Sequence, residues 1–196
     1  MADKTTHKER TRARILDEAA RALRLSGTDG VSVADLMKRA GLTHGGFYAH
    51  FASRDDLVDH AIGRMFEDSS RMLERFVGAG ANAKGLSGLI DYYLAPQAWR
   101  VRDQGCPLPG LSSEAARMPD AARARYQAGV VRFRAAIAAA LAAMGKPGPE
   151  QLAASVMAEM IGAVSMARSF DAEADGLAWL QACRAALRER LGLDAA

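Results

Sequence analysis

The side chains with the clearest chemistry in this 196-residue sequence lie in one short stretch, residues 43–50. Hydrogen-bonding groups surround two adjacent glycines there: Thr43, His44, Gly45, Gly46, Tyr48 and His50. Inside a helix each glycine costs about 0.8–1.0 kcal/mol relative to alanine, so a helix that served only stability would not carry both. Glycines let a backbone approach another surface closely, and the neighbouring donors suit phosphates and base edges. The stretch is therefore predicted to contact a nucleic acid.

Two short helices joined by a tight turn are predicted to position this stretch. Ser32, followed three residues later by an acid, has the spacing of a capping box at the start of the first helix. Gly41 is expected to end that helix. Thr43 is expected to cap the second helix, in which Phe47 and Phe51 share one face. This arrangement allows a second helix to enter a DNA major groove, although two small helices in an ordinary core show the same spacing.

The predicted DNA contacts extend from this motif to its flanks. They are Ser32, Val33, Lys38, Thr43, His44, Gly45, Gly46, Tyr48, His50, Arg54, Arg10, Arg12 and Arg14. The lysine and arginines are expected to contact phosphate, although each arginine of the first helix, taken singly, is equally compatible with a solvated helix start. The second helix has no Arg, Asn or Gln, so base readout is expected to depend on His44 and on the close fit at the glycines.

The distribution of charge supports this interpretation. The first 54 residues contain ten Lys and Arg against six Asp and Glu, all four histidines lie in the first 60 residues, and the rest of the chain is close to neutral. A basic first quarter on a near-neutral remainder is typical of a nucleic-acid-binding region joined to a domain with another task. With 49% hydrophobic and 25% charged residues, the chain can also bury a substantial core.

Residues 40–58, AGLTHGGFYAHFASRDDLV, resemble the recognition region of the TetR family of transcriptional regulators. The arginine-rich segment before them and the helix expected from Ser53 match that family as well, over about the first 60 residues. The resemblance implies a homodimer with an N-terminal DNA-binding domain and a helical C-terminal domain that binds an inducer. The expected function is a sequence-specific transcriptional regulator, most often a repressor in that family, that a small-molecule effector releases from a palindromic operator.

Apolar residues at helical spacing predict an all-α fold of about nine helices. A three-helix head with the helix-turn-helix is expected at residues 1–52, and a helical effector-binding and dimerisation domain at residues 53–196. Besides the motif, helices are expected at residues 6–25, 53–77, 86–95, 109–118, 120–144, 150–169 and 176–191, with a loop at 78–88 and an irregular segment at 97–109. Ser53 and Asp56 form a second capping box.

The sequence lacks the motifs of common enzymes: it has no P-loop, no GxGxxG after a strand, no HExxH and no GxSxG. His44 and His50 are six residues apart rather than four, so we expect no metal site, and we expect no cofactor. The alternative function is a helical enzyme or carrier of apolar small molecules with a purely structural N-terminal motif. The basic first quarter argues against that alternative.

An effector pocket would have to come from aromatic and sulfur-containing residues of the body. The candidates are Phe66, Tyr92, Tyr93, Trp99, Cys106, Met118, Tyr126, Phe133, Met157 and Met160. Together they predict a mostly apolar pocket between helices, although for any one of them ordinary core packing is the simpler explanation. Cys106 is a redox sensor, a ligand contact or a buried structural thiol. We favour the last, because no basic residue closer than Arg102 would lower its pKa.

The last two predicted helices are rich in small residues, which permit close helix–helix approach. We therefore expect a homodimer that joins two such pairs in a four-helix bundle, with a closed monomeric bundle as the alternative. One short recognition helix reads few base pairs, so two of them on a palindromic operator are favoured. No apolar run approaches the ~20 residues of a membrane span, and the charged N-terminus does not resemble a signal peptide, so a cytoplasmic location without membrane association is expected.

Overall fold

The computed structural model describes residues 2–30, 32–78 and 80–193, and these ranges contain nine α-helices, two 3-10 helices and no strand. The predicted all-α fold of about nine helices is therefore confirmed. Within the same ranges, no helix has the length and apolar character needed to cross a lipid bilayer. Met1, Val31, Ala79 and residues 194–196, which belong to the predicted domains and the predicted loop, lie outside the described residues.

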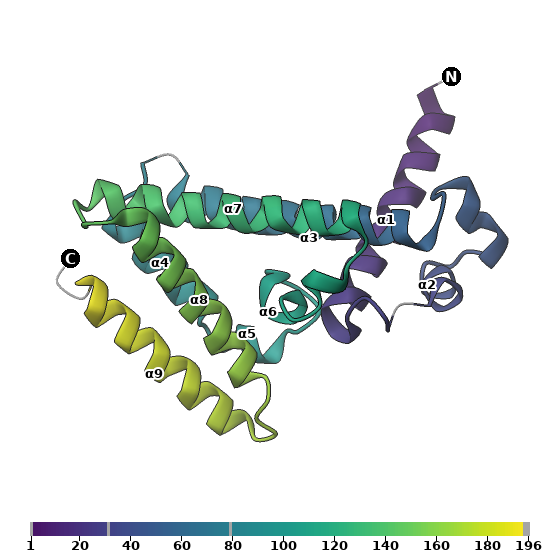
Figure 1. Ribbon diagram of the computed structural model, residues 1–196. Helices are drawn as coiled ribbons and strands as arrows, with labels where there is room; N and C mark the ends of the chain where they lie inside the picture. Colours follow the sequence, from purple (N-terminus) through teal and green to yellow (C-terminus); the bar gives the residue numbers. More distant parts are fainter. Residues whose placement is uncertain (1, 31, 79, 194–196) are drawn as a thin grey trace.

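Two long helices form the spine of the molecule, and the other elements pack around them (Figure 1). In chain order the elements are α1 (Ala2–Ser26), α2 (Val33–Arg39), η1 (His44–Ala49), α3 (Arg54–Val77), α4 (Ala83–Tyr93), α5 (Gln97–Arg100), α6 (Leu108–Leu111), η2 (Ala115–Arg117), α7 (Asp120–Ala143), α8 (Pro149–Ala167) and α9 (Glu173–Leu191). The spine is α3 beside α7. We call α1, α2 and η1 the head, which lies at one end of the spine. We call α3 to α9 the body, in which α8 and α9 pack against each other away from the head.

Side-chain caps set the starts of the two helices that flank the motif, as predicted. The Ser32 hydroxyl accepts a hydrogen bond from the Asp35 backbone N–H at 3.3 Å, and the Ser53 hydroxyl accepts one from the Asp56 N–H at 3.1 Å. The Asp56 carboxylate in turn accepts from the Ala52 N–H at 2.9 Å. These bonds satisfy amide groups that have no partner in the first turn of a helix.

The turn of the motif forms as expected, but the second helix differs from the prediction in its cap and its type. Gly41 has a φ of +67°, the left-handed conformation that closes helix α2. Thr43 precedes η1 without a capping bond from its side chain, so that prediction was wrong. Its carbonyl instead accepts from the Gly46 N–H at 3.0 Å, the i→i+3 pattern of a 3-10 helix. Two glycines leave this segment with little preference for a longer α-helix.

The predicted loop at residues 78–88 is wrong in its second half, because α4 begins at Ala83. The Asn82 side chain caps it by accepting from the Gly85 N–H at 2.9 Å. The glycines that indicated a loop serve close packing instead. A Cβ at Gly85 would lie 2.1 Å from the Phe76 carbonyl oxygen, and one at Gly88 would lie 3.0 Å from the Phe76 ring.

Residues 97–118 also differ from the prediction. The segment expected to be irregular contains the single turn of α5, and the short helix expected at residues 109–118 is divided into α6 and η2. Pro96 and Pro107 precede the two α-helical turns, where a fixed φ favours a helix start. Leu108 and Leu111 anchor α6 in the core. The remaining long helices agree with the predictions except for small shifts at their ends, and α9 begins three residues early.

Candidate nucleic-acid interface and adjoining cleft

Helix η1 turns an apolar face inward and a polar face outward. Phe47 is 1% exposed and stacks on the buried Phe51 with ring centroids 5.7 Å apart. Tyr48, the next residue, is 69% exposed and packs edge-on against Phe47 at 5.2 Å. His44 is exposed as well. The head core thus fixes η1 while it leaves the hydrogen-bonding side chains at the surface.

The two glycines of η1 meet no requirement inside this chain. Neither has a positive φ. A Cβ added at Gly45 would have no atom within 4 Å, and one added at Gly46 would meet only Thr43 Oγ1 at 3.6 Å and Met37 Cε at 3.7 Å, which are ordinary contact distances. Alanine would therefore fit at either position and would favour the helix by up to about 1 kcal/mol. No contact within the described residues therefore requires glycine at either position.

Basic side chains of α1 lie near His50 and Phe51, the two residues that follow η1. The guanidinium carbon of Arg12 lies 4.8 Å from the centre of the Phe51 ring. Burial, followed by the charges of Lys8 and Arg12, lowers the pKa of His50 below its ordinary value, so this imidazole is neutral at neutral pH. Lys8 was missed in the sequence. Its spacing of four residues from Arg12, which places both on one helix face, was the available signal.

The other predicted contacts have more varied surroundings. Lys38 is exposed, Val33 packs partly against the core, and Ser32 is exposed while its hydroxyl caps α2. The Arg54 guanidinium donates to the Thr28 carbonyl and ties the start of α3 to the segment after α1. Arg10 and Arg14 are exposed and stand two residues from Arg12, about 200° away around the helix axis.

A cleft of about 600 Å³ adjoins the head on the body side. Its walls come from α1, α3, α4, α8 and the segment 95–109, so it lies between the head and the body. Three of the predicted pocket residues, Tyr92, Tyr93 and Cys106, line it. The other seven pack in or against the core: Phe66, Trp99, Met118, Tyr126, Phe133, Met157 and Met160. The cleft carries far more charge than the predicted apolar pocket.

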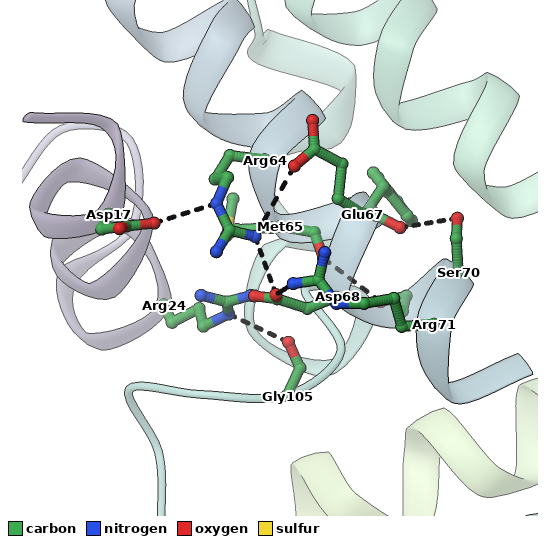
Figure 2. Close-up of polar contacts among 11 residues, drawn as sticks. Asp17, Arg24, Arg64, Met65, Glu67, Asp68, Ser70, Arg71 and Gly105 are labelled. Atoms are coloured by element: carbon green, nitrogen blue, oxygen red, sulfur yellow. Dashed lines mark hydrogen bonds and ion pairs between the residues drawn. The ribbon is translucent and has the colours of Figure 1, made fainter. Parts of the chain in front are cut away.

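Ion pairs between α1 and α3 form one wall of the cleft (Figure 2). Asp68 accepts from Arg24 Nη2 at 3.0 Å and from Arg64 Nη1 at 2.7 Å, and Arg64 Nε donates to Asp17 at 2.9 Å. Arg24 Nε also donates to the Gly105 carbonyl at 3.0 Å, which connects α1 to the segment 95–109. Burial opposes the charge on Asp68, but the hydrogen bonds and charges of Arg64 and Arg24 outweigh it and lower its pKa.

Two neutral groups line the cleft farther inside. Burial raises the pKa of the Cys106 thiol, which therefore stays protonated at neutral pH. Tyr93 is 6% exposed, and within the described chain its hydroxyl oxygen has no hydrogen-bond partner. Among the described residues no three His, Cys, Asp or Glu side chains gather where they could hold a metal ion.

Residues 15–61, which run from α1 through η1 into α3, match the family described as bacterial regulatory proteins, tetR family. This N-terminal region is therefore similar to the DNA-binding region of TetR-family regulators. A further relative is the HTH-type transcriptional repressor KstR2 of Rhodococcus jostii (strain RHA1), 29% identical over 83 residues. That match covers 42% of this chain and 41% of the length of KstR2. The resemblance noted in the sequence is thereby confirmed.

Solved structures extend the TetR likeness to the whole fold. A TetR-family regulator from Agrobacterium tumefaciens superposes with a TM-score of 0.79 at 19% identity, covering 91% of this chain and 98% of its own. The reduced form of NemR from E. coli gives a TM-score of 0.77 at 21% identity, with 91% and 95% covered. At such identities the likeness concerns the fold alone. KstR2 is described as a transcriptional repressor and the Agrobacterium tumefaciens protein as a transcriptional regulator, which agrees with the expectation of a regulator rather than an enzyme.

Proposed function

We propose that this protein is a sequence-specific DNA-binding transcriptional regulator that contacts the major groove through η1. The observation that carries the proposal is the pair Gly45 and Gly46. Gly45 is exposed and Gly46 half-buried, and no contact inside the described chain requires glycine at either position. Removing both Cβ atoms lets the η1 backbone come close to a groove wall. Lys8 and Arg12 flank η1 and would meet the phosphates beside the groove.

The regulator would act as a homodimer through α8 and α9. Small residues that stay exposed along these two helices support this: Ala154, Ser155, Ala158, Ala182, Ala185 and Ala186. A Cβ at Gly162 would also have no atom within 4 Å, so that side of α8 faces open space in the single chain. Burying such a face against its copy would place two heads on the half-sites of a palindromic operator.

The protein would act as a repressor, and a small-molecule effector bound in the cleft would release it from DNA. The cleft supports this because α1 belongs to the head and yet forms part of the cleft wall. An occupant that moves α1 relative to α3 would change the placement of η1 without contact to DNA. We place the division between the DNA-binding domain, residues 1–52, and the effector-binding and dimerisation domain, residues 53–196, at the start of α3.

Selection of bound duplexes from a random DNA pool tests the DNA-binding role. We expect a palindromic consensus and an affinity that falls steeply as salt rises, because phosphate contacts release counterions. Gly46→Glu should abolish binding to the selected site, since it adds bulk and negative charge to the contact face. Ala128→Glu, on the exposed side of α7, adds the same charge to the body and is the matched control. Binding without sequence preference, or full affinity of Gly46→Glu, would contradict the proposal.

A further inference from the structure

The cleft contains a cation without an anionic partner. Arg168, at the end of α8, lines the cleft and is half-buried. Its Nε donates to the Ala98 carbonyl at 2.9 Å. Burial lowers its pKa, and no aspartate or glutamate of the described chain contributes an opposing charge. A half-buried guanidinium keeps its charge and retains further N–H donors for an anion.

The other arginines of the cleft wall that lie toward α3 are already engaged. Arg24 and Arg64 share Asp68, and Arg64 also binds Asp17 (Figure 2). A ligand anion would have to displace these carboxylates to reach either guanidinium. Arg168 is therefore the cation at which an anion meets the least competition.

The Tyr93 hydroxyl supplies a second donor in the same cleft. It is buried and makes no hydrogen bond of normal geometry within the described chain, where the nearby Cys106 thiol is only a weak partner, so a ligand oxygen would satisfy it better. Tyr93 and Arg168 lie close enough for the charge of each to act on the ionisation of the other. A buried hydroxyl and a guanidinium without a carboxylate partner therefore line the same cleft, and together they are a donor set that fits a carboxylate.

We propose that the cleft binds a small organic carboxylate, held by the Arg168 guanidinium and the Tyr93 hydroxyl, with its carbon skeleton against the apolar part of the wall. That part includes Met72 of α3 and Val164 of α8. The inference rests on the effector role proposed above and names the chemical class of the effector. Cys106 takes no covalent part in it, because its thiol stays protonated.

Such a ligand would lie between the head and the body. Ala20 and Arg21 of α1 line the cleft opposite the segment 95–109. A carboxylate that is fixed on α8 would therefore present its skeleton toward α1, and its size would set how closely α1 can pack. Asp103 also lines the cleft, and its carboxylate would repel an anion and attract a cationic amine placed near it. Preferential binding of an amine would therefore contradict the inference.

Calorimetric titration of the full chain, without DNA, tests the ligand class. The probes are octanoate and phenylacetate, each compared with its amide and with the amine of the same skeleton. We expect at least one carboxylate to bind about tenfold more tightly than its amide, because only the acid forms a charge-assisted hydrogen bond with Arg168. Equal affinity of acids and amides, or tighter binding of the amines, would overturn the inference.

Three variants locate the carboxylate. Arg168→Gln should weaken the preferred acid about tenfold and leave its amide unchanged. Tyr93→Phe should weaken the acid about fivefold, and it removes an unpaired buried hydroxyl, so the protein should remain folded in thermal unfolding. Arg123→Gln changes an arginine of α7 that does not line the cleft and is the control. Unchanged acid affinity in both cleft variants would place the ligand elsewhere.

The DNA measurement separates this inference from the proposed function. If the protein binds the selected duplex but prefers no carboxylate, the proposed DNA-binding function is retained and the proposed ligand class is overturned. A protein that prefers a carboxylate, loses this preference in Arg168→Gln and binds no DNA would retain the cleft assignment and overturn the regulator. When both activities are present, addition of the preferred acid should lower the DNA affinity of the wild-type chain.

Discussion

The carboxylate of Asp59 on α3 accepts two hydrogen bonds from the Arg125 guanidinium on α7, from Nε at 2.6 Å and from Nη2 at 2.7 Å. Asp59 is 8% exposed, whereas the Arg125 side chain is about half exposed. Both glycines near this contact allow close packing: a Cβ at Gly63 would lie 2.9 Å from Arg125 Cδ, and one at Gly129 would lie 2.2 Å from the Phe66 ring. The pair therefore fixes α3 to α7 close to the head.

Removal of this pair should lower stability at neutral pH. Asp59→Asn leaves Arg125 without its bidentate partner, and we expect the free energy of unfolding to fall by about 1.5–3 kcal/mol in guanidinium titrations. The pKa of Asp59 is lowered in the folded state, mainly because its carboxylate accepts hydrogen bonds from Arg125. Burial acts in the opposite direction but is the smaller effect. The stabilisation by Asp59 is therefore full at neutral pH and is lost as the pH falls through that lowered pKa, so the difference between wild type and variant should shrink in acid.

The control for this prediction is an ion pair of the same type at the surface. Asp120 pairs with Arg123 at 2.5 Å, but the Asp120 side chain is 93% exposed. Asp120→Asn should change the unfolding free energy by only about 0–1 kcal/mol at any pH. Equal effects of the two substitutions would mean that burial of Asp59 adds nothing to its pair.

Gly45→Ala should separate stability from DNA binding. The added Cβ meets no atom of the chain within 4 Å, and alanine favours the helix, so the unfolding free energy should stay constant or rise by up to about 1 kcal/mol. Affinity for the selected duplex should fall about tenfold, as expected for a methyl group placed between the backbone and a groove wall. A variant that is more stable and binds DNA as well as wild type would remove the main support for the proposed interface.

The two faces of α1 should contribute differently to the salt dependence of DNA binding. Lys8→Ala and Arg12→Ala should each reduce the slope of log affinity against log salt by about 1, because both side chains lie beside His50. Arg12→Ala should also lower the unfolding free energy by about 0.5–1 kcal/mol through the lost contact with Phe51. Arg14→Ala, two residues farther along α1, provides the comparison. A slope that changes only in Arg14→Ala would place the phosphates on the other face of α1.

Ala158→Glu should dissociate the proposed dimer. Ala158 is exposed on α8, and near a two-fold axis the substitution would bring two carboxylates together in an apolar interface. Light scattering after gel filtration should give the mass of one chain, and affinity for the palindrome should fall at least about tenfold. Ala128→Glu on α7 is the charge-matched control. If Ala158→Glu keeps the wild-type mass, whatever that mass is, α8 does not form the interface.

The parts of this structure that could be predicted from the sequence depend on neighbouring residues. The caps at Ser32 and Ser53 join groups three residues apart, so their spacing alone determines them. The apolar faces of the long helices follow for the same reason. The start of α4 was missed because Gly85 and Gly88 indicate a loop, and only the close approach of Phe76 explains why they lie inside a helix.

The cleft could not be predicted, because its character depends on contacts between distant residues. Arg24 is 44 residues from Asp68, and Arg64 is 47 residues from Asp17. The sequence contains many arginines and gives no sign that these two are neutralised while Arg168 is left without a carboxylate. The aromatic and sulfur-containing candidates include Tyr93 and Cys106, which line the cleft, and with equal weight Phe133 and Met160, which pack in the core.

The course of α1 has a consequence for engineered chimeras. This single helix carries Arg12 beside η1 and Arg24 in the cleft wall, twelve residues and about 18 Å farther along. An exchange of residues 1–52 between two TetR relatives, made to transplant operator choice, would also transplant one wall of the cleft that we propose as the effector site. Hybrid biosensors joined at that boundary should therefore inherit altered inducer responses together with their new operators. A graft limited to residues 32–51 would leave α1, and with it the cleft wall, in its original context.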